Sequence, residues 1–268
     1  MNTLDKIIAR KFEEVESRKS LISSKDLEKS VYFGLENISL KAHLTNPAKS
    51  GIIAEFKKKS PSKGIINDKL SPDFVVRGYQ DAGASAVSVL TDIDFFGGND
   101  DDLKLARTVL DIPILRKDFI VDEYQIIEAK AMGANIILLI AAALSPERIV
   151  QLSSFSQSLG LEVLLEVHNQ EELLTNLIDT VDVIGVNNRN LKDFSVDINT
   201  SIRLAELIPD KYLKISESGI SEVDSIIQLK EHGFNGFLIG ENFMKTQDPG
   251  KAMQKFVQEI ESKLSLKS

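Results

Sequence analysis

The chain has 268 residues, of which 43% are hydrophobic and 27% are charged, and it carries a formal charge of -8. A net negative charge of this size argues against the dense basic surface that nonspecific nucleic-acid binding requires, so we expect no nucleic-acid partner. The absence of cysteine excludes disulfides, thiolate catalysis and cysteine-ligated metal centres.

The N-terminal segment MNTLDKIIARKFEEVESRKS mixes acidic and basic residues and lacks an apolar core of the length found in signal peptides. The longest apolar run, Ile136 to Leu144, is too short to span a bilayer. We therefore expect a cytoplasmic protein without a membrane partner. A monomer is taken as the oligomeric state, which the sequence does not decide.

Residues 1–50 are predicted to form a helical extension. Leu4, Ile7, Ile8, Phe12 and Val15 recur at helical spacing with charged residues between them, which indicates an amphipathic helix. The pattern weakens between residues 20 and 50, where we expect one or two short helices and turns.

From residue 51 onward, apolar runs alternate with helical patterns. The predicted strands begin at Gly51, Ala86, Ile112, Asn135, Leu161, Val183, Leu213 and Gly236. The predicted helices cover residues 71–82, 100–110 and 122–132, a segment from residue 145, and residues 170–178, 200–207, 221–232 and 249–264. Ser71 is the expected cap of the first of these helices, and Gly133 ends the third.

Eight strand–helix units in a chain of this length predict a closed parallel α/β barrel, the (β/α)8 TIM barrel, over residues 51–268. A chain of this length could also hold two small domains, but no Pro/Gly/Ser-rich linker divides it, so residues 1–268 are expected to form a single domain. A doubly wound open sheet is the alternative fold. It is disfavoured because the first strand–helix turn lacks a glycine-rich dinucleotide fingerprint.

The stretch GIIAEFKKKSPSKG, residues 51–64, combines a buried strand with a polar loop. Glu55 and Lys57 stand two positions apart, so both point to the same face of the strand and can converge on one ligand. The lysines, serines and glycine that follow suit a loop that binds an anion. In isolation, a strand that ends in charged residues is more often simply a strand that meets solvent.

Chemistry in such barrels is built at the carboxyl ends of the strands. Lys117 follows the third predicted strand and Glu166 the fifth, and a lysine and a glutamate in a barrel mouth can act as general acid and base. A structural ion pair is the alternative interpretation. The sixth strand ends in Asn187-Asn188-Arg189, and the seventh in Ser216-Glu217-Ser218-Gly219.

The loops after the last two strands are suited to a phosphate. Ser218-Gly219 and Gly240-Glu241 each precede a predicted helix or helical turn, where free backbone N–H groups can face a dianion. Barrels of this kind often hold a phosphate in these two loops. Each glycine pair alone could equally be an ordinary turn, but the presence of both favours a phosphorylated small-molecule substrate.

Seven ordered segments give the chain a specific resemblance. They are IIAEFKKKSPSKG (52–64), SVLTDIDFFGG (88–98), ILRKDFI (114–120), LLEVHN (164–169), IGVNNRNL (184–191), SESGIS (216–221) and FLIGENFM (237–244). With them the chain resembles indole-3-glycerol-phosphate synthase of tryptophan biosynthesis over nearly its whole length. The resemblance implies ring closure, decarboxylation and dehydration of 1-(2-carboxyphenylamino)-1-deoxyribulose 5-phosphate, without a metal or other cofactor.

The resemblance also implies roles for individual residues. Lys117 would be the general acid, Glu166 and Glu55 the acid/base and charge-stabilising carboxylates, with Lys57 and Asn187 also in the catalytic set. The substrate-binding residues it implies are Ser60, Pro61, Ser62, Phe96, Arg189 and Ser218. The phosphate-binding residues it implies are Lys57, Gly219, Gly240 and Glu241, the last through its backbone.

Other patterns in the sequence carry weaker interpretations. His43, His168 and His232 are scattered without metal-ligand spacing, and no metal site is expected. The acidic run 99–102 is interpreted as the start of a helix. Two other functions compete: another phosphate-sugar barrel enzyme, such as an isomerase, and a noncatalytic protein that has kept the barrel.

Overall fold

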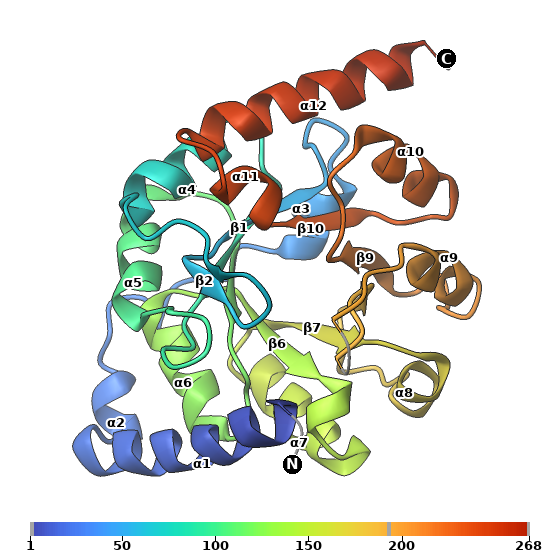
Figure 1. Cartoon of the computed structure of the whole chain (residues 1–268). Coiled ribbons are helices and arrows are strands. Elements are labelled where there is room, and N and C mark those ends of the chain that lie inside the picture. The colour runs from blue at the N-terminus through green and yellow to red at the C-terminus, as the bar shows by residue number, and fades with distance from the viewer. Residues whose placement is uncertain (1–2, 192–193, 267–268) are drawn as a thin grey trace.

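The computed structural model describes residues 3–191 and 194–266, and its centre is a closed eight-stranded parallel barrel surrounded by helices (Figure 1). The strands of the barrel are β1 (Ile52–Phe56), β4 (Ala86–Leu90), β5 (Ile114–Lys117), β6 (Ile136–Ile140), β7 (Glu162–Val167), β8 (Val183–Asn187), β9 (Leu213–Glu217) and β10 (Gly236–Ile239). Each strand pairs with the next along the chain, and β10 pairs with β1 to close the ring. The predicted (β/α)8 barrel is confirmed.

A helix follows each strand of the barrel. These helices are α4 (Pro72–Asp81), α5 (Asp100–Val109), α6 (Glu123–Met132), α7 (Pro146–Ser158), α8 (Gln170–Thr175), α9 (Asn199–Ala205), α10 (Val223–Glu231) and α12 (Pro249–Ser265). A short 3-10 helix, η1 (Ala141–Ala143), follows β6, and the single-turn helix α11 (Glu241–Met244) follows β10.

Local sequence signals explain most of the helix ends. Asp122 and Gln125 form a capping box at the start of α6, and Gly133 ends that helix in the left-handed conformation at φ 88°. Ser71 occupies the cap position of α4 as predicted. Its side chain accepts no backbone hydrogen bond, however, because the hydroxyl contacts the carboxylate of Asp73 instead.

Successive residues of each strand point in turn toward the surrounding helices and toward the barrel interior. The interior is apolar only at the amino-terminal end of the barrel. Ile53, Leu115, Leu164 and Ile215 belong to one buried cluster with residues of α3 (Leu40–Thr45). This short helix closes the amino-terminal end of the barrel, where the Glu162 carboxylate of β7 accepts hydrogen bonds from its first turn. Polar side chains therefore gather at the opposite, carboxyl end.

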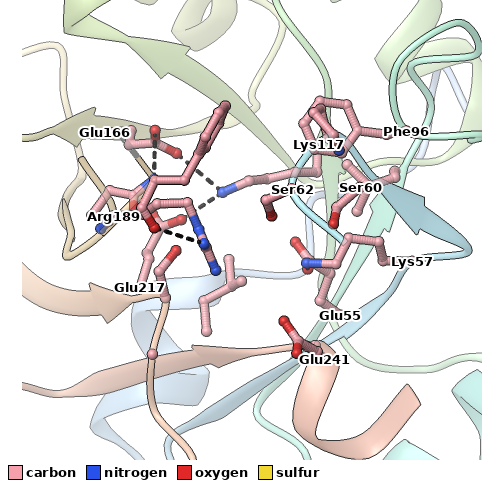
Figure 2. A pocket seen from close by; sticks show the side chains of 18 of the residues that line it. Glu55, Lys57, Ser60, Ser62, Phe96, Lys117, Glu166, Arg189, Glu217 and Glu241 are labelled. Atoms are coloured by element: carbon pink, nitrogen blue, oxygen red, sulfur yellow. Dashed lines mark hydrogen bonds and ion pairs between the residues drawn. The ribbon is translucent and has the colours of Figure 1, made fainter. Parts of the chain in front are cut away.

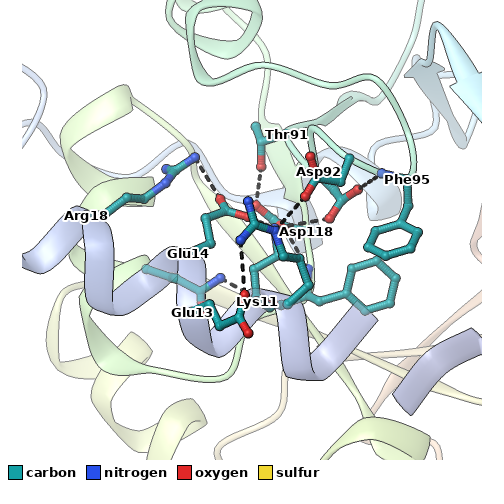
Figure 3. A network of polar contacts seen from close by, with 12 residues as sticks. Lys11, Glu13, Glu14, Arg18, Thr91, Asp92, Phe95 and Asp118 are labelled. Carbon is teal, nitrogen blue, oxygen red and sulfur yellow. Dashed lines mark hydrogen bonds and ion pairs between the residues drawn. The ribbon is translucent and has the colours of Figure 1, made fainter. Parts of the chain in front are cut away.

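The N-terminal extension consists of α1 (Thr3–Leu21), α2 (Ser24–Leu27) and α3, so the predicted short helices are present and the first helix is longer than expected. A network of ion pairs between side chains holds α1 against the carboxyl ends of β4 and β5 (Figure 3). Lys11, only 1% exposed, lies 3.1 Å from Asp92 and 2.9 Å from Asp118. The extension thus contacts both ends of the barrel.

Candidate active site

A cavity of about 370 Å³ opens at the carboxyl ends of the strands. Every residue that the sequence assigned to the site lies in its lining: Glu55, Lys57, Ser60, Pro61, Ser62, Phe96, Lys117, Glu166, Asn187, Arg189, Ser218, Gly219, Gly240 and Glu241. The structure therefore brings together side chains that are up to 186 positions apart, from Glu55 to Glu241. Their individual roles in substrate binding and catalysis are taken up as proposals below.

Lys117 occupies the centre of this cavity, between two carboxylates (Figure 2). It is the last residue of β5, and its Nζ lies 3.2 Å from Oε2 of Glu166 on β7 and 2.5 Å from Oε2 of Glu217 on β9. Asn187, at the end of β8, donates a hydrogen bond of 3.0 Å to the other oxygen of Glu166. Strands β5, β7, β8 and β9 thus position Lys117 and fix the Glu166 carboxylate beside it.

Burial and charge shift the proton affinities of these groups in different directions. Burial alone would lower the pKa of Lys117, but the nearby carboxylates of Glu217, Glu166 and Glu55 outweigh it and raise that pKa. Burial raises the pKa of Glu217 to about 7, against the opposing effect of Lys117. The pKa of Glu166 is lowered, because Lys117 and the hydrogen bonds it accepts outweigh its burial.

Two carboxylates share one ammonium group in this arrangement, so near neutral pH one of them is ionised and the other is poised to carry a proton. The pKa of Glu166 is shifted down and that of Glu217 is shifted up, so Glu166 is the stronger acid of the two. A pair of titratable groups with opposed shifts is a common property of acid/base sites.

Glu217 is the main residue that the sequence analysis did not assign to the site. It is 1% exposed and is the last residue of β9. A signal was available, because Glu217 stands two positions after Ile215 and so shares the inward face of that strand. Gly185 of β8 makes room for it: a Cβ at position 185 would collide with Oε1 of Glu217.

A second charged pair lies on the opposite side of the cavity, at the end of β1 (Figure 2). Nζ of Lys57 lies 2.6 Å from Oε2 of Glu55, so the two residues predicted to share a face do so. Gly240, directly after β10, packs against this pair. A Cβ at position 240 would collide with the Glu55 carboxylate, and glycine is therefore required there by the close approach of the two strands.

We expect Gly240→Ala to lower kcat/KM by at least about tenfold, since the added methyl group must displace the Glu55 carboxylate from Lys57. Steady-state kinetics of the purified variant measure this. Gly34→Ala is the matched control, because a Cβ at position 34 meets nothing within 4 Å and Gly34 does not adopt a positive φ. An unchanged kcat/KM in Gly240→Ala would contradict the requirement for glycine.

The two loops predicted to hold a phosphate lie at the rim of the same cavity. Ser218 and Gly219 both adopt positive φ, 68° and 74°, which turns the chain sharply between β9 and α10. Gly240 is the residue immediately before α11, as predicted, so the N–H groups of that turn lack helical partners. Lys63 and Lys245 add positive charge nearby: Lys63 lies 3.7 Å from Glu241, and Lys245 lines the cavity.

Apolar side chains form a further wall of the cavity. The rings of Phe96 and Phe119 pack with their centroids 5.9 Å apart, and Leu4 and Ile7 of α1 complete the lining. The loop after β1 folds back over the mouth as a small hairpin of β2 (Lys59–Ser60) and β3 (Gly64–Ile65), which carries Pro61. The site therefore combines charged groups on its floor with a flat apolar flank.

Arg189 lies at the edge of the site, after β8. Its backbone N–H donates to the side chain of Asn187, and its guanidinium donates to the carbonyl of Phe194. Part of the loop between them, residues 192 and 193, lies outside the described residues. A cation at this rim provides a second place for an anionic group of the substrate.

The remaining sequence predictions concern metals and membranes. Within residues 3–191 and 194–266, no group of three or more histidine or carboxylate side chains is placed to hold a metal ion. Asn99 caps α5 as predicted, but Asp100 also pairs with Arg18 and Asp102 with Lys58. None of the described helices has the length and apolar character needed to cross a membrane.

Together, the barrel, the buried lysine with its carboxylates and the two glycine loops define an acid/base enzyme built on a phosphate-binding (β/α)8 barrel. The family model described as indole-3-glycerol phosphate synthase matches residues 4–256. The chain belongs to the indole-3-glycerol phosphate synthase family.

Two curated relatives illustrate the similarity. The indole-3-glycerol phosphate synthase of Bacteroides thetaiotaomicron is 48% identical over 258 residues, which cover 96% of this chain and 98% of the relative. That of Acinetobacter baumannii is 43% identical over 250 residues and 93% of each chain. The chain accordingly converts 1-(2-carboxyphenylamino)-1-deoxyribulose 5-phosphate to indole-3-glycerol phosphate, carbon dioxide and water, a carboxy-lyase step of tryptophan biosynthesis.

Solved structures of low sequence identity share the fold alone. A mutant tryptophan synthase alpha-subunit from the hyperthermophile Pyrococcus furiosus superimposes with a TM-score of 0.60 at 14% identity, over 80% of this chain and 99% of that one. A structure titled "Native KDPGal structure" gives a TM-score of 0.56 at 13% identity, over 81% and 94% of the two chains. These matches agree with the barrel topology.

Proposed function

We propose that Lys117 is the general acid of the ring closure. The new bond joins the ring carbon that bears the carboxylate to the ketone carbon, whose oxygen must receive a proton. Lys117 is the buried ammonium group at the centre of the cavity, and its surrounding carboxylates keep it protonated until substrate arrives. This central position between Glu166 and Glu217 is the observation that carries the proposal.

The two carboxylates beside Lys117 supply the remaining proton transfers. After carbon dioxide leaves, the hydroxyl formed from the ketone departs as water, and the neighbouring carbon loses a proton. Glu217, whose pKa lies near neutrality, returns a proton to Lys117, which then protonates the departing hydroxyl, and Glu166, the ionised member of the pair, accepts the proton from carbon. None of these steps transfers electrons to or from a cofactor, and side chains supply the proton transfers. The reaction is therefore proposed to need neither a metal nor a redox group.

The rest of the cavity binds the substrate. Lys57, with the Glu55 carboxylate beside it, lies between the proton-transfer groups and the rim and would contact the phosphate end. The phosphate itself would be held by the N–H groups of Gly219, Gly240 and Glu241, where negative charge is favoured.

The aromatic ring of the substrate would lie against the apolar flank formed by Phe96 and Pro61. Asn187, Arg189 and Ser218 would face its carboxylate and the sugar hydroxyls. The side chains of Ser60 and Ser62, on the hairpin above, would add hydrogen bonds to the same ligand. The placement of Arg189 and Lys245 at two points of the cavity lining supports this orientation.

The proposal is tested by mixing the purified protein and the carboxyphenylamino-deoxyribulose phosphate in the presence of a metal chelator and following indole fluorescence. We expect product to form, and Glu166→Gln to lower kcat by at least about a hundredfold, since a general base contributes 10²–10⁴-fold. Glu171→Gln, exposed on α8, is the control. Product formation at the normal rate in Glu166→Gln would remove that residue from the mechanism.

We also propose the domain organisation, the oligomeric state and the location of the enzyme. One domain over residues 1–268 is supported by the packing of the extension 1–50 against both ends of the barrel 51–268. We propose a monomer in the cytoplasm, and the charge of -8 argues against a nucleic-acid partner.

A further inference from the structure

His168 lies directly behind Glu166, on the side away from the substrate. Glu166 belongs to β7, whereas His168 follows the last residue of that strand and its ring turns back toward Glu166. Nε2 of His168 lies 3.3 Å from Oε1 of Glu166, and the ring is buried. Nothing in the proposed reaction uses this histidine, although it contacts a carboxylate that does.

Glu172 holds the other side of the imidazole. Its Oε2 lies 3.2 Å from Nδ1 of His168 and also accepts a 2.8 Å hydrogen bond from the backbone N–H of that residue. Its Oε1 accepts from the side chain of Asn169, which in turn caps α8 by accepting from the N–H of Glu172. The start of α8 thus fixes Glu172, and Glu172 fixes the orientation of the ring.

The two carboxylates that contact His168 favour the imidazolium. Glu166 faces it from β7 and Glu172 from α8, while Lys117 of β5 and Glu217 of β9 lie beyond Glu166. Burial would lower the pKa of His168, but the two carboxylates outweigh it and raise that pKa to about 10. The ring is therefore a cation throughout the physiological range.

We propose that His168, oriented by Glu172, is a positioning residue for Glu166: its ring fixes the Glu166 carboxylate from behind and keeps it ionised and aimed at the substrate. The inference rests on the role proposed above for Glu166. An ion pair with His168 and hydrogen bonds from Asn187 and Lys117 then surround a single carboxylate, so its orientation is set before substrate binds.

The kinetic test compares His168→Gln with the wild type between pH 6 and pH 10.5. We expect kcat to fall about ten- to hundredfold, because the ion pair with the Glu166 carboxylate is lost, with KM changed less than about twofold because His168 does not line the cavity. The ratio of wild-type to variant kcat should be largest below about pH 9 and approach one as the pH rises through about 10. His232→Gln, which removes a half-buried histidine that does not line the cavity, is the matched control.

Glu172→Gln serves as a second variant that leaves His168 in place. It should lower kcat by a smaller factor, and Glu171→Gln, its exposed neighbour, should not. If His168→Gln does not fold, the Glu172 pair of variants decides the question. A kcat within twofold of wild type at every pH in His168→Gln or in Glu172→Gln would overturn the proposal.

A direct measurement follows the imidazole signals of His168 by NMR during a pH titration. In the wild type the ring should titrate near pH 10, and in Glu166→Gln its midpoint should fall by at least one unit toward the ordinary value of about 6.5. An unshifted midpoint would overturn the contact. Loss of turnover in Glu166→Gln with wild-type kinetics in His168→Gln would reject this inference alone, whereas full activity in Glu166→Gln would reject the role of Glu166 itself.

Discussion

Lys117→Ala is expected to lower kcat by about 10³-fold or more while the protein remains folded. The variant removes the ammonium group that protonates the ketone oxygen, and general acid catalysis of this kind contributes 10²–10⁴-fold. The loss in kcat should exceed the lower value of this range, about 10²-fold, because Lys117 also balances the charges of Glu166 and Glu217. Without Lys117 these two carboxylates would repel one another. Single-turnover indole fluorescence measures the rate of the chemical steps.

Binding should survive this substitution, because the phosphate loops lie on β9 and β10 rather than on β5. Inhibition by a substrate analogue, or its binding by calorimetry, should therefore change much less than kcat. Lys214→Ala is the matched control: Lys214 is also a lysine on a barrel strand, but its Nζ donates to the carbonyl of Ala205. Turnover in Lys117→Ala within tenfold of the wild type would refute the assignment.

The barrel and most of the site could be predicted because their signals are local. Each strand is a short apolar run, most of the helices have their own cap or glycine end, and chain length limits the number of units. The rule that parallel strands present their carboxyl ends at one face then brings Glu55, Lys117 and Glu166 together without knowledge of the contacts. The structure places all three in one cavity.

What the sequence could not supply is the pairing across the barrel. Lys117 and Glu217 are 100 positions apart, and only the closed ring of strands makes them neighbours. The contact between His168 and Glu166 was missed for a different reason. A residue just beyond a strand can turn toward solvent or back toward the site, and here the cap of α8 turns it back.

The attachment of α1 to the barrel depended on a similarly remote contact. Lys11 is one of the charged residues between the apolar positions of this helix, yet it is buried against Asp92 and Asp118, 81 and 107 positions later (Figure 3). Helical spacing identifies the apolar face of a helix but not a charged residue that an ion network draws into the interior.

Lys11→Met is expected to lower the free energy of unfolding by about 3–5 kcal/mol, the usual cost of removing one partner from a buried ion pair. Methionine keeps much of the volume, so the loss comes from leaving Asp92 and Asp118 buried without their shared cation. Urea denaturation followed by circular dichroism measures it. Lys6→Met, an exposed lysine on the same helix, should change stability by less than about 0.5 kcal/mol.

The pH dependence separates lost charge pairing from lost packing. Burial would raise the pKa of Asp118, but Lys11 and Arg116 outweigh it and lower that pKa to about 2. Its contribution to stability is therefore fully present above the ordinary aspartate value of about 3.9 and is lost as the pH falls toward 2.

The stability difference between wild type and Lys11→Met should accordingly be largest above about pH 4 and shrink in acid. A difference that stayed constant down to pH 2.5 would assign the effect to packing instead. Because Leu4 and Ile7 of the same helix line the cavity, the variant should also raise KM more than it lowers kcat. The charge network beneath α1 would then contribute to the apolar wall of the active site as well as to the fold.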